Sequence, residues 1–215
     1  MLIDLHTHTA QYSSCSSLAV AEIVVGSRAA GFDAICLSEH DKMWPAERVA
    51  ELSRSLSFPI FRAMEVTTSE GHVLVFGLDE YQEGMFSLSR LRSIVTTRSA
   101  AIIKSHPMRD SDAGTSGRAM SDYLKQFDAI EVLSGGESEQ SNASALMLAK
   151  SHSIAASGGG DVHAPSEIGR FATRFERRIT DEYMLASEIK AGRITPFETA
   201  RDDTQKRLGR SDAPG

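Results

Sequence analysis

The chain begins with Met1-Leu2-Ile3-Asp4-Leu5-His6-Thr7-His8, a short apolar run that ends in two histidines one residue apart. Successive side chains of a β-strand point to opposite faces, so His6 and His8 share one face if the strand continues that far. Two imidazoles on one face can hold a single metal ion, and Asp4 on the same face could orient one of them. An isolated pair of this kind is often only a surface feature, so the rest of the chain decides its meaning.

Histidines and acidic residues recur beside later apolar runs. Those that follow such a run are Glu39-His40-Asp41, Glu65, His106-Pro107 and Asp161-Val162-His163, whereas His72 stands at the start of one. A carboxylate can span two cations while a neutral imidazole holds one, so Glu65 and Asp161 are the natural bridging candidates. This pattern predicts a metal site of mixed nitrogen and oxygen ligands, which suits zinc, manganese or iron.

Each candidate also has an ordinary explanation. Glu65 follows an apolar stretch, where an unpaired carboxylate would be costly, so either a buried hydrogen-bonded role or a metal bridge must account for it. His106 could be a plain strand-end histidine before Pro107, and His72 a polar residue at the start of a strand. His152 closes a predicted helix, where the terminal carbonyl groups explain it, so we exclude it from the site.

The spacing of apolar runs predicts alternating strands and helices. The pattern indicates strands at 2–5, 34–37, 59–63, 72–76, 101–104, 129–132 and 154–156, and helices at 18–30, 45–56, 88–98 and 138–150. Ser17 is the expected N-cap of the first helix and Gly31 its stop. Two architectures fit, an open doubly wound sheet and a closed barrel. A barrel gathers its strand ends at one rim, so the placement of the candidates favours the barrel.

The composition bounds the class of protein. A chain of 215 residues with 41% hydrophobic content fits one soluble domain, expected over 1–200, with a polar, frayed tail at 201–215 and a mobile loop at 109–118. The net charge of −6 argues against long nucleic acid as a partner but leaves small anionic substrates plausible. Cys15 and Cys36 cannot form a disulfide framework, and we find no leader peptide or membrane-spanning stretch. We therefore expect a cytoplasmic protein, and nothing in the sequence indicates a protein partner.

In this order, His6-x-His8, Glu39-His40-Asp41, Glu65, His106-Pro107 and Gly160-Asp161-x-His163 resemble the motifs of the PHP (polymerase and histidinol phosphatase) superfamily, over about residues 1–175. The resemblance implies an α/β fold, a distorted (β/α)7 barrel that is TIM-like, with two or three divalent ions at the C-terminal rim of the strands. It also implies the distribution of the ligands. His6, His8, Glu65 and Asp161 would hold one ion, Glu65 with His106 and His72 a second, and His40 with His163 a third, with Glu131 where some relatives supply a further ligand.

Two positions depart from the family pattern. Relatives often carry an acidic residue or a histidine shortly after the first motif, whereas this chain has Ser13-Ser14-Cys15, so the third ion is weak, absent or bound by the cysteine. Glu39 stands where many relatives have aspartate. Together with the Cys15-Ser16 pair and Ile168-Gly169-Arg170-Phe171-Ala172-Thr173, it resembles a subset commonly described only as metal-dependent phosphoesterases.

The implied chemistry is hydrolysis of a phosphate ester. A divalent ion lowers the pKa of bound water from about 15.7 toward ~7, which makes hydroxide available at neutral pH. Charge on the phosphoryl oxygens calls for a cationic side chain, for which Arg170 is the first candidate and Arg109 the second, although either can be a solvated surface arginine. The leaving oxygen could be protonated by bound water or by Asp41, and the spacing does not decide between them.

We therefore predict a metal-dependent phosphoesterase that acts on a small phosphorylated metabolite or a nucleotide. One alternative is an exonuclease or phosphodiesterase on short nucleic-acid ends, which needs a basic track to the rim, where Arg109 and Arg118 are the loop cations. The other is a non-catalytic metal-binding module of the same family, which the missing third-site acid would permit.

Overall fold

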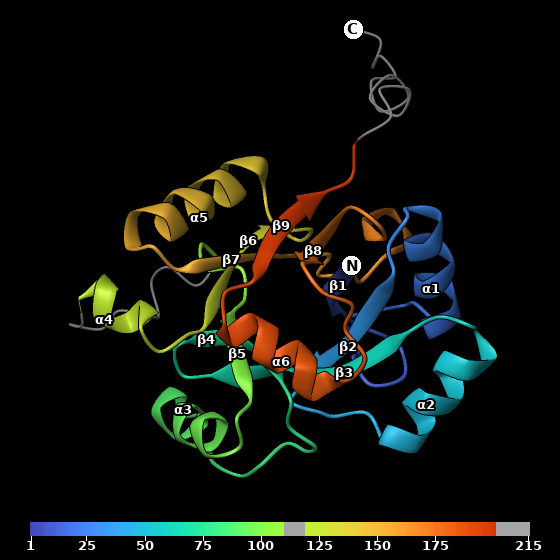
Figure 1. Ribbon diagram of the computed structural model, residues 1–215, viewed down its shortest axis with the longest axis horizontal. Coiled ribbons are helices and arrows are strands. Elements are labelled where there is room, and N and C mark those ends of the chain that lie inside the picture. The colour runs from blue at the N-terminus through green and yellow to red at the C-terminus, as the bar shows by residue number, and fades with distance from the viewer. Residues whose placement is uncertain (110–118, 201–215) are drawn as a thin grey trace, which may run out of the picture.

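The computed structural model describes residues 1–109 and 119–200, whose strands form one mixed sheet wrapped into a nearly closed, distorted barrel (Figure 1). Helices surround the strands in the ribbon view. In chain order the elements are β1 (Leu2–Thr7), α1 (Val20–Ala29), β2 (Ala34–His40), α2 (Ala46–Ser55), β3 (Ile60–Thr68), β4 (Gly71–Phe76), α3 (Leu88–Thr97), β5 (Ala101–Lys104), α4 (Met120–Leu124), β6 (Ala129–Ser134), α5 (Glu139–His152), β7 (Ala155–Gly159), the 3-10 helix η1 (Pro165–Glu167), β8 (Phe171–Phe175), α6 (Glu182–Lys190) and β9 (Ile194–Glu198).

The predicted α/β barrel is confirmed, but its strands are not all parallel. Hydrogen bonding joins them in the order β7-β6-β5-β4-β3-β2-β1-β8-β9. The pairs β1–β2, β2–β3, β5–β6 and β6–β7 are parallel, while β4 is antiparallel to both of its neighbours. Strand β8 is antiparallel to β1 and to β9. Because β4 and β8 are reversed, their first residues lie at the rim where the parallel strands end.

The barrel closes where β7 lies against β8 and β9, and the contact there differs from a regular ladder. The Thr173 hydroxyl donates to the carbonyl of Gly158 at 2.7 Å and accepts from its backbone N–H at 2.9 Å. A Cβ at Gly158 would lie 2.6 Å from the backbone oxygen of Ala172, so only glycine allows this approach. One side chain thus supplies the hydrogen bonds that a neighbouring strand would otherwise provide.

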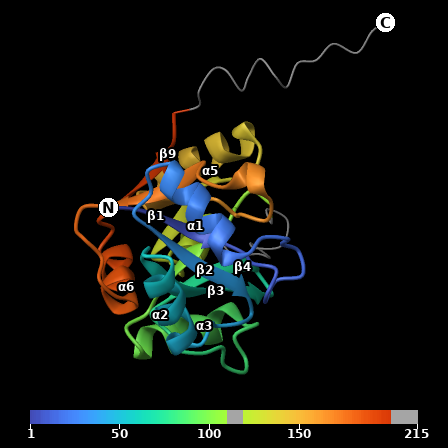
Figure 2. The ribbon, with the colours of Figure 1, turned by 90° about the vertical axis from the view of Figure 1, so that its right-hand side faces the viewer.

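The interior of the barrel is apolar at one end and polar at the other. Ala34 and Cys36 of β2 and Phe61 and Ala63 of β3 point into the interior cluster, and Leu185 of α6 packs against the same cluster. Helix α6 therefore covers one end of the barrel, and in Figure 2 it lies on the opposite side from the loop that follows β1. Two further clusters fill the space between the strands and the outer helices.

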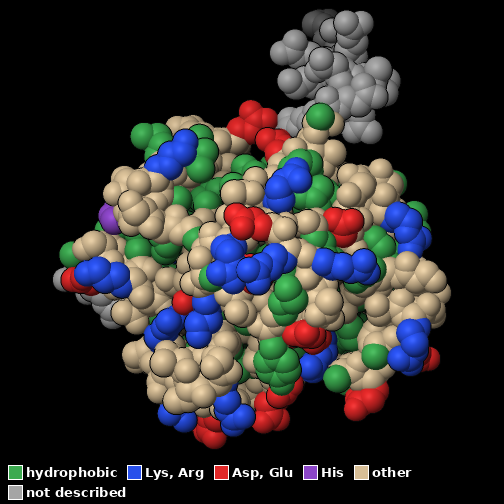
Figure 3. Space-filling model, in the orientation of Figure 1, with side chains coloured by type: hydrophobic (Ala, Val, Ile, Leu, Met, Phe, Trp, Pro, Cys, Tyr) green, Lys and Arg blue, Asp and Glu red, His purple; other side chains and the backbone are tan. Residues whose placement is uncertain are grey.

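The face around α6 carries mixed charge. Lys and Arg side chains are interspersed with Asp and Glu in Figure 3. Arg62 pairs with Glu182 and Asp79, and Arg193 with Glu188, at this end of the barrel. These pairs offset part of the positive charge of this face.

The seven predicted strands correspond to β1 to β7, and the remaining differences are local. Strands β8 and β9 and helices α4 and α6 were not predicted. Helix α1 begins later than expected, with Ala19 as N-cap, because the Glu22 carboxylate accepts from the Ala19 N–H at 2.8 Å in place of Ser17. Gly31 ends this helix at φ +80°, as predicted. The single-domain boundary at residue 200 stays a prediction.

The expected tail at 201–215 and most of the expected loop at 109–118 lie outside the described residues. Among the residues that are described, no helix combines the length and the apolar character that crossing a membrane would require.

Candidate metal centre

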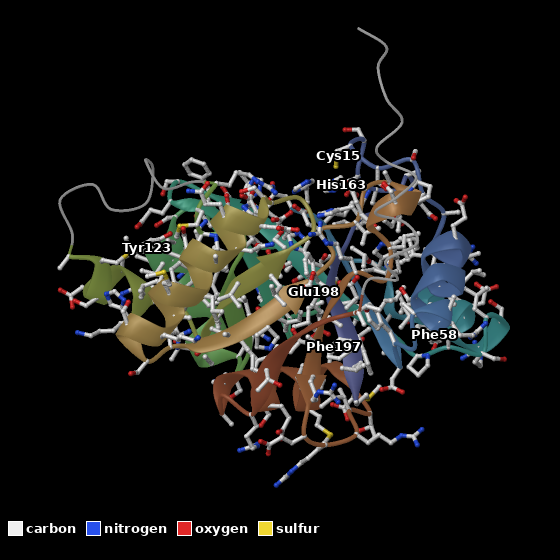
Figure 4. All side chains as sticks on the ribbon, turned by 90° about the horizontal axis from the view of Figure 1, so that it is seen from above. Cys15, Phe58, Tyr123, His163, Phe197 and Glu198 are labelled. Atoms are coloured by element: carbon white, nitrogen blue, oxygen red, sulfur yellow. The ribbon has the colours of Figure 1, made fainter. Side chains whose placement is uncertain are left out.

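Eight side chains predicted to hold metal lie together at the polar end of the barrel, away from α6. Strand alternation explains part of this convergence: the faces that carry Ala63 of β3 and Leu74 of β4 toward the interior also carry Glu65 and His72 inward at the rim. Figure 4 shows two labelled side chains of this rim, Cys15 and His163, close to each other at the opposite end from α6. The converging residues are His6, His8, His40, Glu65, His72, His106, Asp161 and His163.

Glu65 is the centre of this cluster. The sequence placed Glu65 after the end of a strand, whereas the structure places it within β3. Its side chain is 1% exposed. Burial raises the pKa of Glu65, but the neighbouring His6 and His106 lower it more, so the group lies well below its usual range. Its two oxygens lie 3.1 to 3.4 Å from an imidazole nitrogen of each of five residues: His6, His8, His40, His72 and His106.

Asp161 approaches the same rings from the other side. Its Oδ1 lies 3.4 Å from His6 Nε2 and 3.6 Å from His8 Nε2, while its Oδ2 accepts from Arg109 Nη2 at 2.8 Å. Burial raises the pKa of Asp161, but His6 and His8 bring it below its usual range. Its backbone has φ +47°, a conformation that costs an aspartate energy and recurs at functional sites.

The hydrogen bonds of His6 fix which ring nitrogen faces the cluster. Its Nδ1 lies 3.0 Å from Glu131 Oε1, and a carboxylate oxygen accepts, so Nδ1 carries the hydrogen. The buried Nε2 makes no hydrogen bond and lies 3.3 Å from Glu65 Oε2. Burial lowers the pKa of His6, but Glu65, Glu131 and Asp161 raise it well above the usual value. The gap between Nε2 and the carboxylates thus demands positive charge, from a second proton or from a cation.

His8 and His163 are oriented in the same way. His8 Nδ1 lies 3.4 Å from the Ser13 hydroxyl, which itself donates to Glu39, so the His8 Nε2 is left facing Glu65 and Asp161 without a hydrogen bond. His163 Nδ1 lies 2.8 Å from the Asp161 carbonyl oxygen, which can only accept. Hydrogen bonds at the outer nitrogen that leave the inner one free are the usual arrangement around metal-binding histidines.

The residues present therefore fit divalent cations. Buried carboxylates, together with imidazole nitrogens that no proton need occupy, are the donor set of sites for zinc, manganese and iron. Within residues 1–109 and 119–200, three groups have ligand atoms that all lie within 4.8 Å of one another: His6 with His8 and Asp161; His40 with Glu65 and His72; and His8 with Cys15, His40 and His163.

Three acidic residues support the ligands instead of joining these groups. Glu131 orients the His6 ring through one oxygen, and its other oxygen accepts from the His106 backbone N–H at 3.0 Å. Glu39 points away from the centre and accepts from Thr9, Ser13 and Trp44. The sequence singled out both residues, but their partners are distant along the chain, so the pattern alone could not give these roles.

Asp4 is the third, and it does not orient an imidazole as the sequence suggested. Its Oδ1 accepts from the backbone N–H groups of Gly160, at 2.8 Å, and of His6, at 3.1 Å. Its Oδ2 is buried without a hydrogen-bond partner. Burial raises the pKa of Asp4 to about 7, although both N–H groups oppose the shift.

This raised pKa predicts a pH dependence that Asp4→Asn removes. A folded-state pKa of about 7, above the unfolded value of about 3.9, means that the stabilisation is complete below about pH 4 and is lost as the pH rises through 7. In chelator, the free energy of unfolding of the parent should fall between pH 5 and 8 by about 2 kcal/mol more than that of the variant. Denaturant titrations measure it, with the exposed Asp33→Asn as control, since Asp33 also accepts a backbone N–H. Parallel pH profiles for parent and Asp4→Asn would contradict the assignment.

The two predicted phosphate-binding arginines lie in different places. Arg109 is at the centre, bonded to Asp161 and, at 2.6 Å, to Glu137. Arg170 stacks its guanidinium 4.5 Å over the ring of Phe171 and lines a cavity of about 420 Å³ between β6, α5, β8 and β9. Its role in substrate binding stays a prediction. Asp41 accepts from the Thr67 N–H at 2.8 Å, a contact that stabilises the chain at the end of β2.

His152 lies away from the centre, as predicted. It is exposed at the end of α5, where its Nδ1 lies 3.1 Å from the carbonyl oxygen of Leu148. A residue that sequence reasoning missed is Ser13, which links Glu39 to His8. Its only signal was its position in the polar run after the first motif.

Comparison with solved structures shows the same fold in several proteins. PsfC from Pseudomonas syringae PB-5123 superposes with a TM-score of 0.67 at 18% identity, covering 97% of this chain and 94% of that one. A provisionally assigned metal-dependent phosphoesterase from Bifidobacterium adolescentis gives 0.61 at 15% identity, with coverages of 88% and 96%. An amidohydrolase from Chromobacterium violaceum, with bound sulfate and no metal, gives 0.62 at 16%, with coverages of 92% and 98%.

Comparison of the sequence with curated proteins gives no match. Family models do match: one described as "PHP-associated" covers residues 139–194, and one described as "PHP domain" covers residues 4–166, which is most of the chain. This span includes every residue of the candidate metal centre. The chain belongs to the PHP domain family.

Proposed function

We propose that this protein is a metal-dependent phosphoesterase that hydrolyses a phosphate ester of a small metabolite or a nucleotide. The observation that carries the proposal is the pair of buried Nε2 atoms of His6 and His8. Both face Glu65 and Asp161, and neither makes a hydrogen bond. Burying these groups costs several kcal/mol unless positive charge between the rings and the carboxylates offsets it. Bound cations would supply this positive charge and would also serve the hydrolysis of an ester.

In this proposal two or three ions, of zinc, manganese or iron, use the ligands that converge at the rim. His6, His8, Glu65 and Asp161 would hold the first, Glu65 with His72 and His106 the second, and His40 with His163 the third. When bound, such ions make hydroxide available near neutral pH and offset the negative charge of a phosphoryl group. The family membership and the phosphoesterase assigned to one structural neighbour support this reaction class.

The protein's own side chains complete the site in three ways. Glu131 and Ser13 hold the rings of His6 and His8 so that their Nε2 atoms stay directed inward. The Arg109 side chain is 37% exposed, and its guanidinium can leave Glu137 for a phosphoryl oxygen while it still contacts Asp161. A planar guanidinium binds phosphate oxygens in pairs, which would orient the ester toward the ions.

Asp161→Asn tests the function. The full chain and the variant are loaded with Mn²⁺ or Zn²⁺, their metal content is measured, and both are assayed on phosphomonoesters and phosphodiesters with and without chelator. Chelator-sensitive turnover should fall about a hundredfold in the variant, because a neutral amide is a weaker ligand than a carboxylate. Asp79→Asn, at the opposite end of the barrel, is the matched control.

Three outcomes would redirect the proposal. Bound metal without turnover on any ester indicates a non-catalytic metal-binding module. Turnover confined to oligonucleotide ends, with a steep dependence on salt, indicates an exonuclease. Turnover that survives both the chelator and the substitution would place the active site elsewhere.

A further inference from the structure

We propose that Cys15 supplies a thiolate ligand to the third cation site, and that this site therefore selects zinc-like ions over manganese or magnesium. The inference rests on the proposed metal centre but not on its catalytic activity. The ligand atoms of Cys15, His8, His40 and His163 all lie within 4.8 Å of one another. Because the His8 Nε2 faces Glu65 and Asp161 and belongs to the first ion, the ligands left for the third ion are the Cys15 sulfur and the imidazoles of His40 and His163. One sulfur and two imidazole nitrogens, with one open position, are a ligand set that suits tetrahedral Zn²⁺.

The rings of His40 and His163 flank the ring of His8. His8 lies between the other two, with ring centroids 4.5 Å from His40 and 4.5 Å from His163. The His8 ring is fully buried, and its Nε2 has no hydrogen bond. The His163 Nδ1 is occupied by the Asp161 carbonyl, so its Nε2 is the atom free for an ion.

The loop that carries Cys15 is held on both sides of the cysteine. On one side, Ser13 donates to Glu39. On the other, the Ser16 hydroxyl donates to the His8 carbonyl oxygen at 2.9 Å and lies 3.4 Å from that of His163. Both anchors of the loop are therefore tied to the elements that carry the histidine ligands. Figure 4 shows Cys15 next to His163 as a result of this arrangement.

The chemistry of sulfur then distinguishes this site from its neighbours. The other two groups combine imidazole with carboxylate, and such sets accept manganese as well as zinc or iron. A thiolate is a soft ligand that favours zinc and binds magnesium and manganese poorly. The other cysteine, Cys36, is buried in the interior of the barrel among apolar side chains and cannot reach an ion at the rim.

Cobalt substitution tests this assignment without an activity assay. The full chain is stripped with chelator and titrated with Co²⁺, and its absorption spectrum is recorded. We expect a near-ultraviolet sulfur-to-cobalt charge-transfer band that disappears in Cys15→Ser and persists in Cys36→Ala, while visible cobalt bands from the other sites remain in all three. A charge-transfer band that survives in Cys15→Ser would overturn the proposal.

Zinc-loaded protein gives a second measurement. X-ray absorption should show a sulfur neighbour at about 2.3 Å in the parent, which Cys15→Ser lacks. The variant should bind the Zn²⁺ of the third site about a hundredfold less tightly, as expected when one of three protein ligands is lost. Zn²⁺, but not Mn²⁺, should also protect the parent's exposed thiol from alkylation.

The alkylation experiment needs no variant, so it decides the question even if Cys15→Ser does not fold. Visible cobalt bands without a sulfur band would refute the cysteine ligand and leave the metal centre intact. No cobalt binding at all would refute the metal centre as well.

Discussion

Glu65→Gln is expected to lower phosphoester turnover about a thousandfold and to lower the number of tightly bound ions. The two oxygens of Glu65 face five imidazole nitrogens, and a carboxamide offers only one acceptor oxygen in their place. Its NH₂ group would point at ring nitrogens that the ions need, and an amide does not bridge two cations. A loss of about 4 kcal/mol in stabilisation of the transition state corresponds to this factor in rate.

Elemental analysis and steady-state kinetics measure the two effects on the same preparations. Glu51→Gln is the control, since Glu51 is an exposed carboxylate of α2 that pairs with Arg48. The melting temperature in chelator distinguishes a lost ligand from a misfolded chain. A Glu65→Gln protein with full metal content and parental turnover would remove Glu65 from the centre.

Among substitutions that add one methyl group at the rim, Gly135→Ala is expected to destabilise the folded protein most. A Cβ at this position would lie 1.9 Å from the Gly160 carbonyl oxygen, where β6 and β7 end side by side. The clash is with backbone, so the two strand ends must separate. The expected cost is about 3 kcal/mol or more, with a fall in melting temperature of about 10 °C. Because Asp161 follows Gly160 directly, cation affinity should fall in the same variant.

Thermal denaturation and cation titration of one sample measure both losses. Gly31→Ala makes the same chemical change where nothing lies within 4 Å of the new Cβ, although φ there is +80°. It should cost only about 1 kcal/mol, from backbone strain alone, and leave cation affinity unchanged. Equal losses in the two variants would mean that the contact between β6 and β7 is not the cause.

The sequence predicted the parts of the fold that follow from local pattern. Continuous apolar runs located β1 to β7, because strands buried on both faces have little polar interruption. Strands β8 and β9 escaped detection, since β8 includes the exposed Arg174 and β9 includes Pro196. Helix α6 has one buried face, but nothing nearby indicated that this face would cover the end of a barrel.

In the candidate site too, the sequence predicted what depends on local pattern and missed what depends on contacts between distant segments. Residue type and order brought out the eight proposed ligands, and the reversed direction of β4 accounts for His72, whose place at the start of a strand had set it apart. The supporting contacts could not be predicted in this way. Glu131 meets His6 across 125 residues of chain, and Glu39 meets Ser13 across 26. Such roles depend on the closed barrel and leave no periodic signal.

The narrow contact between β7 and β8 has a consequence for how the molecule assembles. Glu65 and His72 come from one hairpin and can meet early in folding, since local pairings form fastest. Asp161 and His163 come from the other half of the chain, where Val162 pairs with the end of β1 and Thr173 joins β8 to Gly158 as the ring is completed. The complete set of ligands therefore exists only in the closed barrel, and a bound ion stabilises the closed form against opening of this joint.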